Sequence, residues 1–233
     1  MKEKKTGTWK IWVVTIFLFA IVVAATIRVS TLPVLNFTAK GSKVHIVIDP
    51  GHGGFDPGKV GTMGTLEKDE NLNISLKLRE ILTKSGYTVA MTREKDEALC
   101  GETTGKKKVE DLNARLAVID KEKPELTVSI HQNSYSAGTK GAQVFYYSGS
   151  EEGKRLANVL QETIKEEMGD GNHRVEKAND SYYMLKKSSG PFVIIECGFL
   201  SNPEEEKLLI SEEYQQKMAK AVAEGIEKFL YNE

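Results

Sequence analysis

From Lys43 to the C-terminus, short apolar runs alternate with longer amphipathic segments, and this alternation restricts the fold more than any other feature. Five apolar runs are expected to form strands, at 43–49, 87–92, 125–131, 141–147 and 191–199. The segments expected to form helices are 67–86, 109–122, 151–168, a short stretch after Pro203, and 212–229. Strands that alternate with such helices predict an α/β domain, with a mostly parallel, twisted sheet of about six strands and helices on both faces.

A basic and then apolar segment precedes this domain. The first ten residues, MKEKKTGTWK, are rich in lysine, and residues 11–27 follow without a charge. This length is at the short end for a membrane-spanning helix, and the lysines should stay on the cytoplasmic side. The stretch VVAATIRVS has small residues but no clear A-x-A site, so an uncleaved apolar anchor helix is favoured over a cleaved signal peptide. We therefore expect an anchor or signal segment at 1–27, a linker at 28–42 and an extracytoplasmic domain at 43–233.

Charge and cysteine content exclude several classes of protein. A net charge of −1 provides no electrostatic footprint for nucleic acid. The two cysteines, Cys100 and Cys197, form neither a disulfide framework nor a CxxC metal site. A single bridge between them stays open for an exported protein. Cys197, however, lies in an apolar run, where a buried reduced thiol is the simpler interpretation.

Four polar residues stand out against this pattern. His52 lies in the glycine-rich turn DPGHGGFDPG after the first expected strand, and His131 ends the run LTVSIH. Glu196 ends FVIIE, and Glu67 opens the first expected helix. A helix start favours a glutamate by itself, but an ionised carboxylate in the apolar run PFVIIECGFL is costly unless something pairs with it. In parallel α/β sheets, ligands gather at the carboxyl ends of the strands, where three of these residues are expected.

Two histidines and a glutamate are a ligand set used by catalytic zinc, which keeps its fourth position for water. Here the ligands would be His52, Glu67 and His131, which are too far apart in sequence for a local zinc-finger spacing. Glu196 would then serve as the general base for a water whose pKa the zinc lowers to about 7. From spacing alone, separate structural roles for the four residues remain open.

The motifs IDPGHGGFDPG, LEKDENL, VSIHQNS and IIECGFLSNPEEEKLL resemble, in this order, those of the zinc-dependent N-acetylmuramoyl-L-alanine amidases of bacterial cell walls, the amidase_3 group. The resemblance runs from about residue 43 to 229 and implies one Zn²⁺ per chain, bound by His52, Glu67 and His131, with Glu196 catalytic. It implies hydrolysis of the amide between the lactyl group of N-acetylmuramic acid and the L-alanine of the stem peptide.

Two departures from the family pattern are mild. Ser134 stands where many members have alanine, and Cys197 where leucine or valine is common. Strand alternation should point the Cys197 sulfur to the face opposite Glu196 and away from the metal.

Substrate contacts are less defined by the sequence. Asn133 could hydrogen-bond a substrate amide, and Arg115 could bind a substrate carboxylate, although a structural ion pair suits Arg115 equally well. Segment 178–190 resembles the groove-lining stretch of the family, with Tyr182 or Leu185 beside the peptide stem. Two other functions stay open: a peptidoglycan-binding regulator without activity, and a zinc carboxypeptidase or aminopeptidase.

The arrangement of the whole chain is similar to that of the germination-specific amidases of spore-forming bacteria. It has an apolar anchor, the loop GETTGKKKVEDLNAR, and neither wall-binding repeats nor a long regulatory helix. The similarity implies a role in spore cortex maturation, where removal of stem peptides permits muramic-δ-lactam formation, and in germination. It places the protein in the cell envelope or the forespore intermembrane space. The loop from Asp96 to Lys108 is where we expect a regulatory protein partner.

Overall fold

The computed structural model describes residues 44–101 and 107–231. Six strands form one sheet in the order β2-β1-β3-β6-β4-β5. Their bounds are β1 His45–Pro50, β2 Thr88–Met91, β3 Leu126–Asn133, β4 Gln143–Tyr146, β5 Lys177–Ala178 and β6 Phe192–Phe199. All neighbours pair in parallel except β4 and β6, which run antiparallel. The predicted sheet of about six mostly parallel strands is confirmed.

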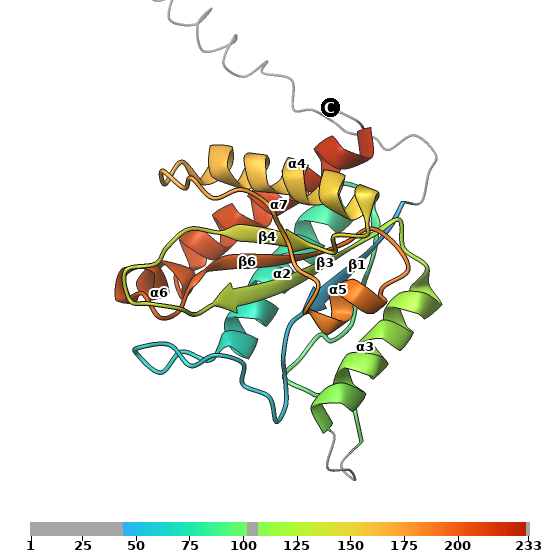
Figure 1. Ribbon diagram of the computed structural model, residues 1–233, viewed down its shortest axis with the longest axis horizontal. Helices are drawn as coiled ribbons and strands as arrows, with labels where there is room; N and C mark the ends of the chain where they lie inside the picture. Colours follow the sequence, from blue (N-terminus) through green and yellow to red (C-terminus); the bar gives the residue numbers. More distant parts are fainter. Residues whose placement is uncertain (1–43, 102–106, 232–233) are drawn as a thin grey trace, which may run out of the picture. The chain divides into compact units, whose positions relative to one another are not determined.

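The helices cover both faces of this sheet, as the alternating pattern predicts (Figure 1). The helices are α2 Glu67–Lys84, α3 Lys107–Glu122, α4 Glu151–Met168, α5 Tyr183–Lys187, α6 Pro203–Leu209 and α7 Glu212–Tyr231. Helices α2, α4 and α7 pack together on one face over the larger apolar core, whereas α3 and α5 lie over a smaller core on the other. The sequence pattern missed two short elements, α5 and β5, because neither is long enough to show a period.

Helix ends follow local chemistry where the sequence offers it. The Ser150 side chain accepts a hydrogen bond from the backbone N–H of Gly153 and starts α4, and Gly169 ends that helix in the left-handed conformation. Asn202 caps α6 in the same way, with Pro203 in its first turn. Helix α2 starts without a side-chain cap, at Glu67, so this carboxylate is available for other contacts.

Both cysteines are free thiols, and Cys197 is buried in the larger core. The single bridge is therefore not formed, and the prediction that the Cys197 sulfur points away from Glu196 agrees with its place in that core. The predicted anchor at 11–27 and linker at 28–42 lie outside the described residues. Among the helices of residues 44–101 and 107–231, none is long and apolar enough to cross a membrane.

Candidate metal centre and catalytic site

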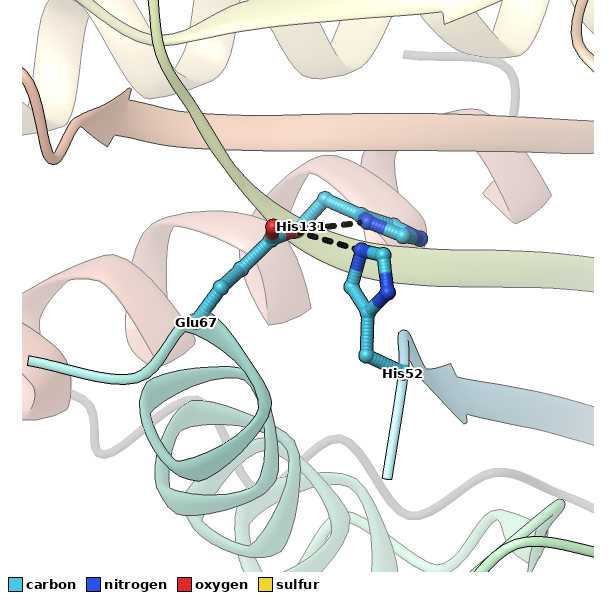
Figure 2. Close-up of side chains that lie close together, drawn as sticks. All are labelled: His52, Glu67 and His131. Carbon is cyan, nitrogen blue, oxygen red and sulfur yellow. Dashed lines mark hydrogen bonds and ion pairs between the residues drawn. The ribbon is translucent and has the colours of Figure 1, made fainter. Parts of the chain in front are cut away.

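The three residues predicted to bind zinc come together at the carboxyl end of the parallel strands (Figure 2). His52 lies in the turn after β1, Glu67 is the first residue of α2, and His131 lies near the end of β3. His52 Nε2 is 3.1 Å and His131 Nδ1 is 2.9 Å from Glu67 Oε1. One donor atom from each residue lies within 4.8 Å of the other two.

This geometry fits a zinc ion. Zinc–ligand bonds of about 2.0–2.2 Å in a tetrahedron place two ligand atoms roughly 3.3 Å apart, close to both measured separations. Glycine at position 51 leaves room for the imidazole of His131, because a Cβ on Gly51 would lie 2.2 Å from that ring. A Cβ on Gly58 would lie 2.5 Å from Glu67 Oε2. These two glycines therefore let the backbone pass close to His131 and Glu67. The donor atoms, two imidazole nitrogens and a carboxylate oxygen, are of the types that zinc prefers.

His52 is held by an aspartate that the sequence did not single out. Its Nδ1 lies 2.9 Å from Asp56 Oδ2, so a proton on Nδ1 is donated to Asp56 and Nε2 is left for a metal. Burial lowers the pKa of His52, but hydrogen bonds and charges from Asp56 and Glu67 outweigh burial and raise it to about 9. A metal bound at Nε2 would therefore have to displace a proton from His52 at neutral pH.

Two buried arginines hold the turn that carries His52. Arg93 donates to the carbonyls of Pro50 and Gly51, both at 2.9 Å. Arg115 donates to the carbonyls of Pro50, at 2.7 Å, and His52, at 2.5 Å. His52 itself has a φ of 60°, which is uncommon for a residue other than glycine. The strained backbone persists because the arginines bind its carbonyls on both sides.

Glu67 is the most buried of the three predicted ligands, with only 2% of its surface exposed. Its Oε2 accepts from the backbone N–H of Lys59 at 2.7 Å, and its Oε1 from that of Gln132 at 3.2 Å. Burial raises its pKa, but hydrogen bonds and charges from both histidines outweigh burial and hold the pKa well below its usual range. Glu67 is therefore an anion at neutral pH.

Asn71, one helical turn after Glu67, joins all three ligand-bearing segments. This fully buried amide donates to the Gly51 carbonyl at 3.0 Å and more weakly to Glu67 Oε1 at 3.4 Å. Its oxygen accepts from Gln132 Nε2 at 3.3 Å. Neither Asn71 nor Asp56 was predicted from the sequence to belong to the site. Their signal was available, since Asn71 follows Glu67 at helical spacing and Asp56 follows His52 in the same turn.

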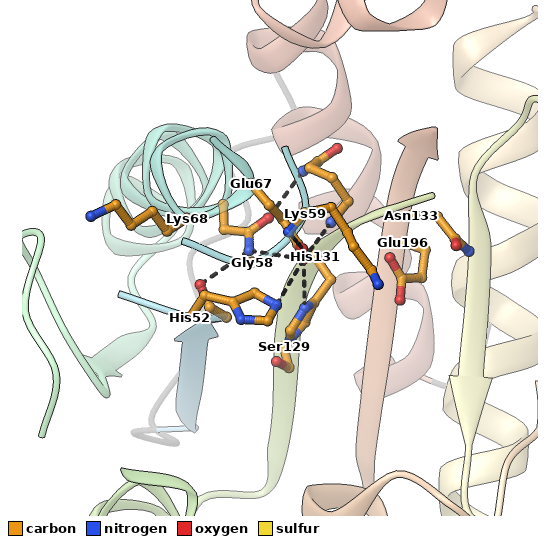
Figure 3. A network of polar contacts seen from close by, with 12 residues as sticks. His52, Gly58, Lys59, Glu67, Lys68, Ser129, His131, Asn133 and Glu196 are labelled. Carbon is orange, nitrogen blue, oxygen red and sulfur yellow. Dashed lines mark hydrogen bonds and ion pairs between the residues drawn. The ribbon is translucent and has the colours of Figure 1, made fainter. Parts of the chain in front are cut away.

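Glu196 lies beside this group on the neighbouring strand (Figure 3). Its register partner on β3 is His131. The side chain is 7% exposed, and the Tyr182 hydroxyl lies 3.4 Å from its Oε1. Burial raises the pKa of Glu196 to about 7. Within the described part of the chain, the buried Oε2 of Glu196 has no hydrogen-bond partner, so one acceptor of this carboxylate lacks a protein donor.

The two predicted substrate contacts have different surroundings. Asn133 is partly exposed at the end of β3, and its Oδ1 accepts from the backbone N–H of Ser134 at 2.8 Å. Its predicted role stays a prediction. Arg115 is 1% exposed and donates to Asp49 Oδ1 at 2.9 Å and Asp111 Oδ2 at 2.6 Å. Together with its two carbonyl contacts, these ion pairs support the structural alternative for Arg115.

The loop expected to contact a partner is described only in part, because residues 102–106 lie outside the described residues. At its end, Lys108 Nζ lies 3.2 Å from Asp56 Oδ2. The segment is therefore connected to His52, a predicted metal ligand, through the single carboxylate of Asp56.

Comparisons with known proteins identify the family of this chain. Residues 46–228 match the Amidase_3 family model, N-acetylmuramoyl-L-alanine amidase. The germination-specific N-acetylmuramoyl-L-alanine amidase of Bacillus subtilis is 37% identical over 188 residues, which cover 79% of this chain and 78% of that protein.

Two solved structures extend the comparison. The CwlD amidase from Clostridioides difficile, in complex with the GerS lipoprotein, superposes with a TM-score of 0.78 at 42% identity, covering 81% of this chain and 99% of that one. The amidase AmiC2 of Nostoc punctiforme superposes with a TM-score of 0.72 at 34% identity, covering 82% and 98%. This chain therefore belongs to the Amidase_3 family of N-acetylmuramoyl-L-alanine amidases.

Proposed function

We propose that this protein is a zinc-dependent peptidoglycan amidase that hydrolyses the bond between the lactyl group of N-acetylmuramic acid and the L-alanine of the stem peptide. His52, Glu67 and His131 would hold one Zn²⁺ through Nε2, a carboxylate oxygen and Nδ1. Zinc in such a site supplies Lewis-acid polarisation of an amide carbonyl and lowers the pKa of a water to about 7. Asp56 keeps the His52 imidazole oriented, and the fixed Glu67 keeps the ligand spacing.

Glu196 is proposed as the general base and then the general acid. Its carboxylate would take a proton from the attacking water and deliver it to the nitrogen of the leaving L-alanine as the amide bond breaks. The single observation that supports this role is the unpartnered Oε2 of Glu196, buried beside the ligand set. A pKa of about 7 suits a group that must accept and release a proton near neutral pH.

Digestion of purified peptidoglycan, followed by mass spectrometry, tests the reaction. The zinc-loaded protein should release intact stem peptides and leave peptide-free glycan. Loss of a terminal residue would instead identify a carboxypeptidase or aminopeptidase, and unchanged peptidoglycan would identify a binding protein. Glu196→Gln keeps the size of the side chain and the ligand set, so it should retain zinc and lose cleavage; retained cleavage would remove Glu196 from the mechanism.

We further propose a role in spore cortex maturation, supported by the likeness to the germination-specific amidase of B. subtilis. Peptidoglycan lies outside the cytoplasmic membrane, which agrees with the predicted export or anchoring through residues 11–27. The C. difficile relative was solved with the GerS lipoprotein, which supports the prediction of a protein partner. Muropeptide analysis of spores from a deletion strain tests the role: muramic-δ-lactam should be depleted, and normal lactam levels would contradict it.

A further inference from the structure

The backbone N–H and the backbone carbonyl of Lys59 both hydrogen-bond to Glu67, a proposed metal ligand. Its N–H donates to Glu67 Oε2 at 2.7 Å, and its carbonyl accepts from the Glu67 N–H at 2.9 Å. The next residue, Val60, forms an antiparallel bridge with Leu66, so Lys59 starts a short hairpin that ends at Glu67. The Lys59 backbone therefore cannot shift without moving a ligand.

The tip of this hairpin is also fixed. Glu206 of α6 is fully buried and accepts from the Thr62 hydroxyl at 2.5 Å and from the Met63 N–H at 3.1 Å. Burial raises the pKa of Glu206, but these hydrogen bonds outweigh burial and lower it. The Glu206 carboxylate therefore fixes the tip of the hairpin, and Glu67 fixes its base. The backbone from which the Lys59 side chain extends is held at both ends of the hairpin.

The Lys59 ammonium, in contrast, makes no contact with an acceptor of the described residues. Lys68 Nζ binds the Gly54 carbonyl and Asp96, and Lys108 binds Asp56, while Arg93 and Arg115 are occupied as described above. Lys59 is exposed, and within residues 44–101 and 107–231 its Nζ makes neither a hydrogen bond nor an ion pair. In Figure 3 its side chain points toward the side of the site where Glu196 lies. The Lys59 side chain thus carries an unpaired positive charge beside the site, on a backbone that is fixed by hydrogen bonds.

We propose that Lys59 binds a substrate carboxylate, namely the free α-carboxylate of the second, γ-linked glutamate of the stem peptide. This proposal rests on the proposed function, because it places the scissile carbonyl at the ligand set. At an extended spacing of 3.3–3.6 Å per residue, the carbon that bears this carboxylate lies about 7 Å from the scissile carbonyl. The four-carbon stem of a lysine spans roughly 6 Å, so an ammonium rooted beside Glu67 reaches that distance.

The experiment is a double-mutant cycle across enzyme and substrate. Two synthetic muramyl peptides are compared that differ only at the second residue, which carries either a free α-carboxylate or an uncharged carboxamide. The wild type should prefer the carboxylate by about 5- to 30-fold in kcat/KM, the range of a partly exposed charge-assisted hydrogen bond, with most of the change in KM. Lys59→Gln should cut both peptides at the rate at which the wild type cuts the carboxamide, and Lys59→Arg should restore the preference.

Matched measurements separate this role from others. Lys220→Gln removes an exposed lysine of α7 and should leave the preference unchanged. Zinc content should be equal in all variants, because the Lys59 contacts to Glu67 use only backbone atoms. An equal loss of rate on both peptides, or an intact preference in Lys59→Gln, would overturn the proposal while the proposed function stands. If the zinc-loaded wild type cuts neither peptide, the proposed function itself fails.

Discussion

Removing the negative charge of Asp56 should weaken zinc binding without unfolding the protein. Asp56 Oδ2 lies 2.9 Å from His52 Nδ1, and its Oδ1 accepts from the Gly58 N–H at 3.2 Å. Asp56→Asn keeps the shape of the side chain and can keep the contact to Gly58. Loss of a carboxylate that orients a ligating histidine typically lowers metal affinity by about 10- to 100-fold.

A second effect of Asp56→Asn opposes the first near neutral pH. With a pKa of about 9, metal-free His52 is roughly 1% neutral at pH 7, so the wild type loses about 100-fold in zinc affinity to the bound proton. Asp56→Asn removes one of the two anions that raise this pKa and so reduces that cost. The zinc affinity of the wild type should therefore increase about tenfold per pH unit up to about pH 9. The deficit of the variant should be larger at pH 9.5 than at pH 7.

Competition with a chromophoric zinc chelator at both pH values measures these affinities, and thermal unfolding of the metal-free proteins reports the fold. Asp96→Asn is the matched control, because Asp96 accepts from the N–H of Gly54 in the same turn without contacting the imidazole. Its zinc affinity should match that of the wild type. Equal affinities of Asp56→Asn and the wild type at pH 9.5 would refute the argument that Asp56 orients a metal ligand.

Two further predictions concern Glu196 and Arg115. Burial raises the pKa of Glu196 to about 7, and a general base must be ionised, so kcat/KM should fall about tenfold per pH unit below that pKa; this acidic limb should be lost in the residual activity of Glu196→Gln, and its persistence there would assign the limb to another group. Arg115→Met should lower the free energy of unfolding by about 3–5 kcal/mol, because Asp49 and Asp111 lose the buried cation that pairs with both. Urea denaturation measures this loss, and a variant of normal stability with a raised KM would instead support substrate binding by Arg115.

Much of the fold was predictable because it depends on local periodicity. The bounds of α4 agree with the expected range, and those of α2 and α7 differ by two residues at their C-terminal ends. Apolar spacing fixes such helices whatever they pack against. The antiparallel pairing of β4 with β6 was not predictable in this way, because the direction of a strand depends on the connection before it and leaves no mark in the apolar pattern.

The candidate site residues could be named from the sequence, because His52, Glu67, His131 and Glu196 interrupt a regular pattern and their motifs identify the family. Their contacts, in contrast, follow from the packing of distant segments. In the proposed site, Nε2 of His52 and Nδ1 of His131 are the donor atoms, because Asp56 occupies the other nitrogen of His52 and His131 Nδ1 lies beside Glu67.

The tertiary structure also assigned the surrounding charges. The sequence around Arg115 does not separate a substrate contact from an ion pair, whereas its burial between Asp49 and Asp111 favours the ion pair. In the sequence, nothing distinguishes Lys59 from other loop lysines; in the structure, its backbone N–H donates a hydrogen bond to Glu67. The physical reason is common to both cases. A side chain's residue type sets what it can bind, but burial and long-range hydrogen bonds, which only packing creates, set what it does bind.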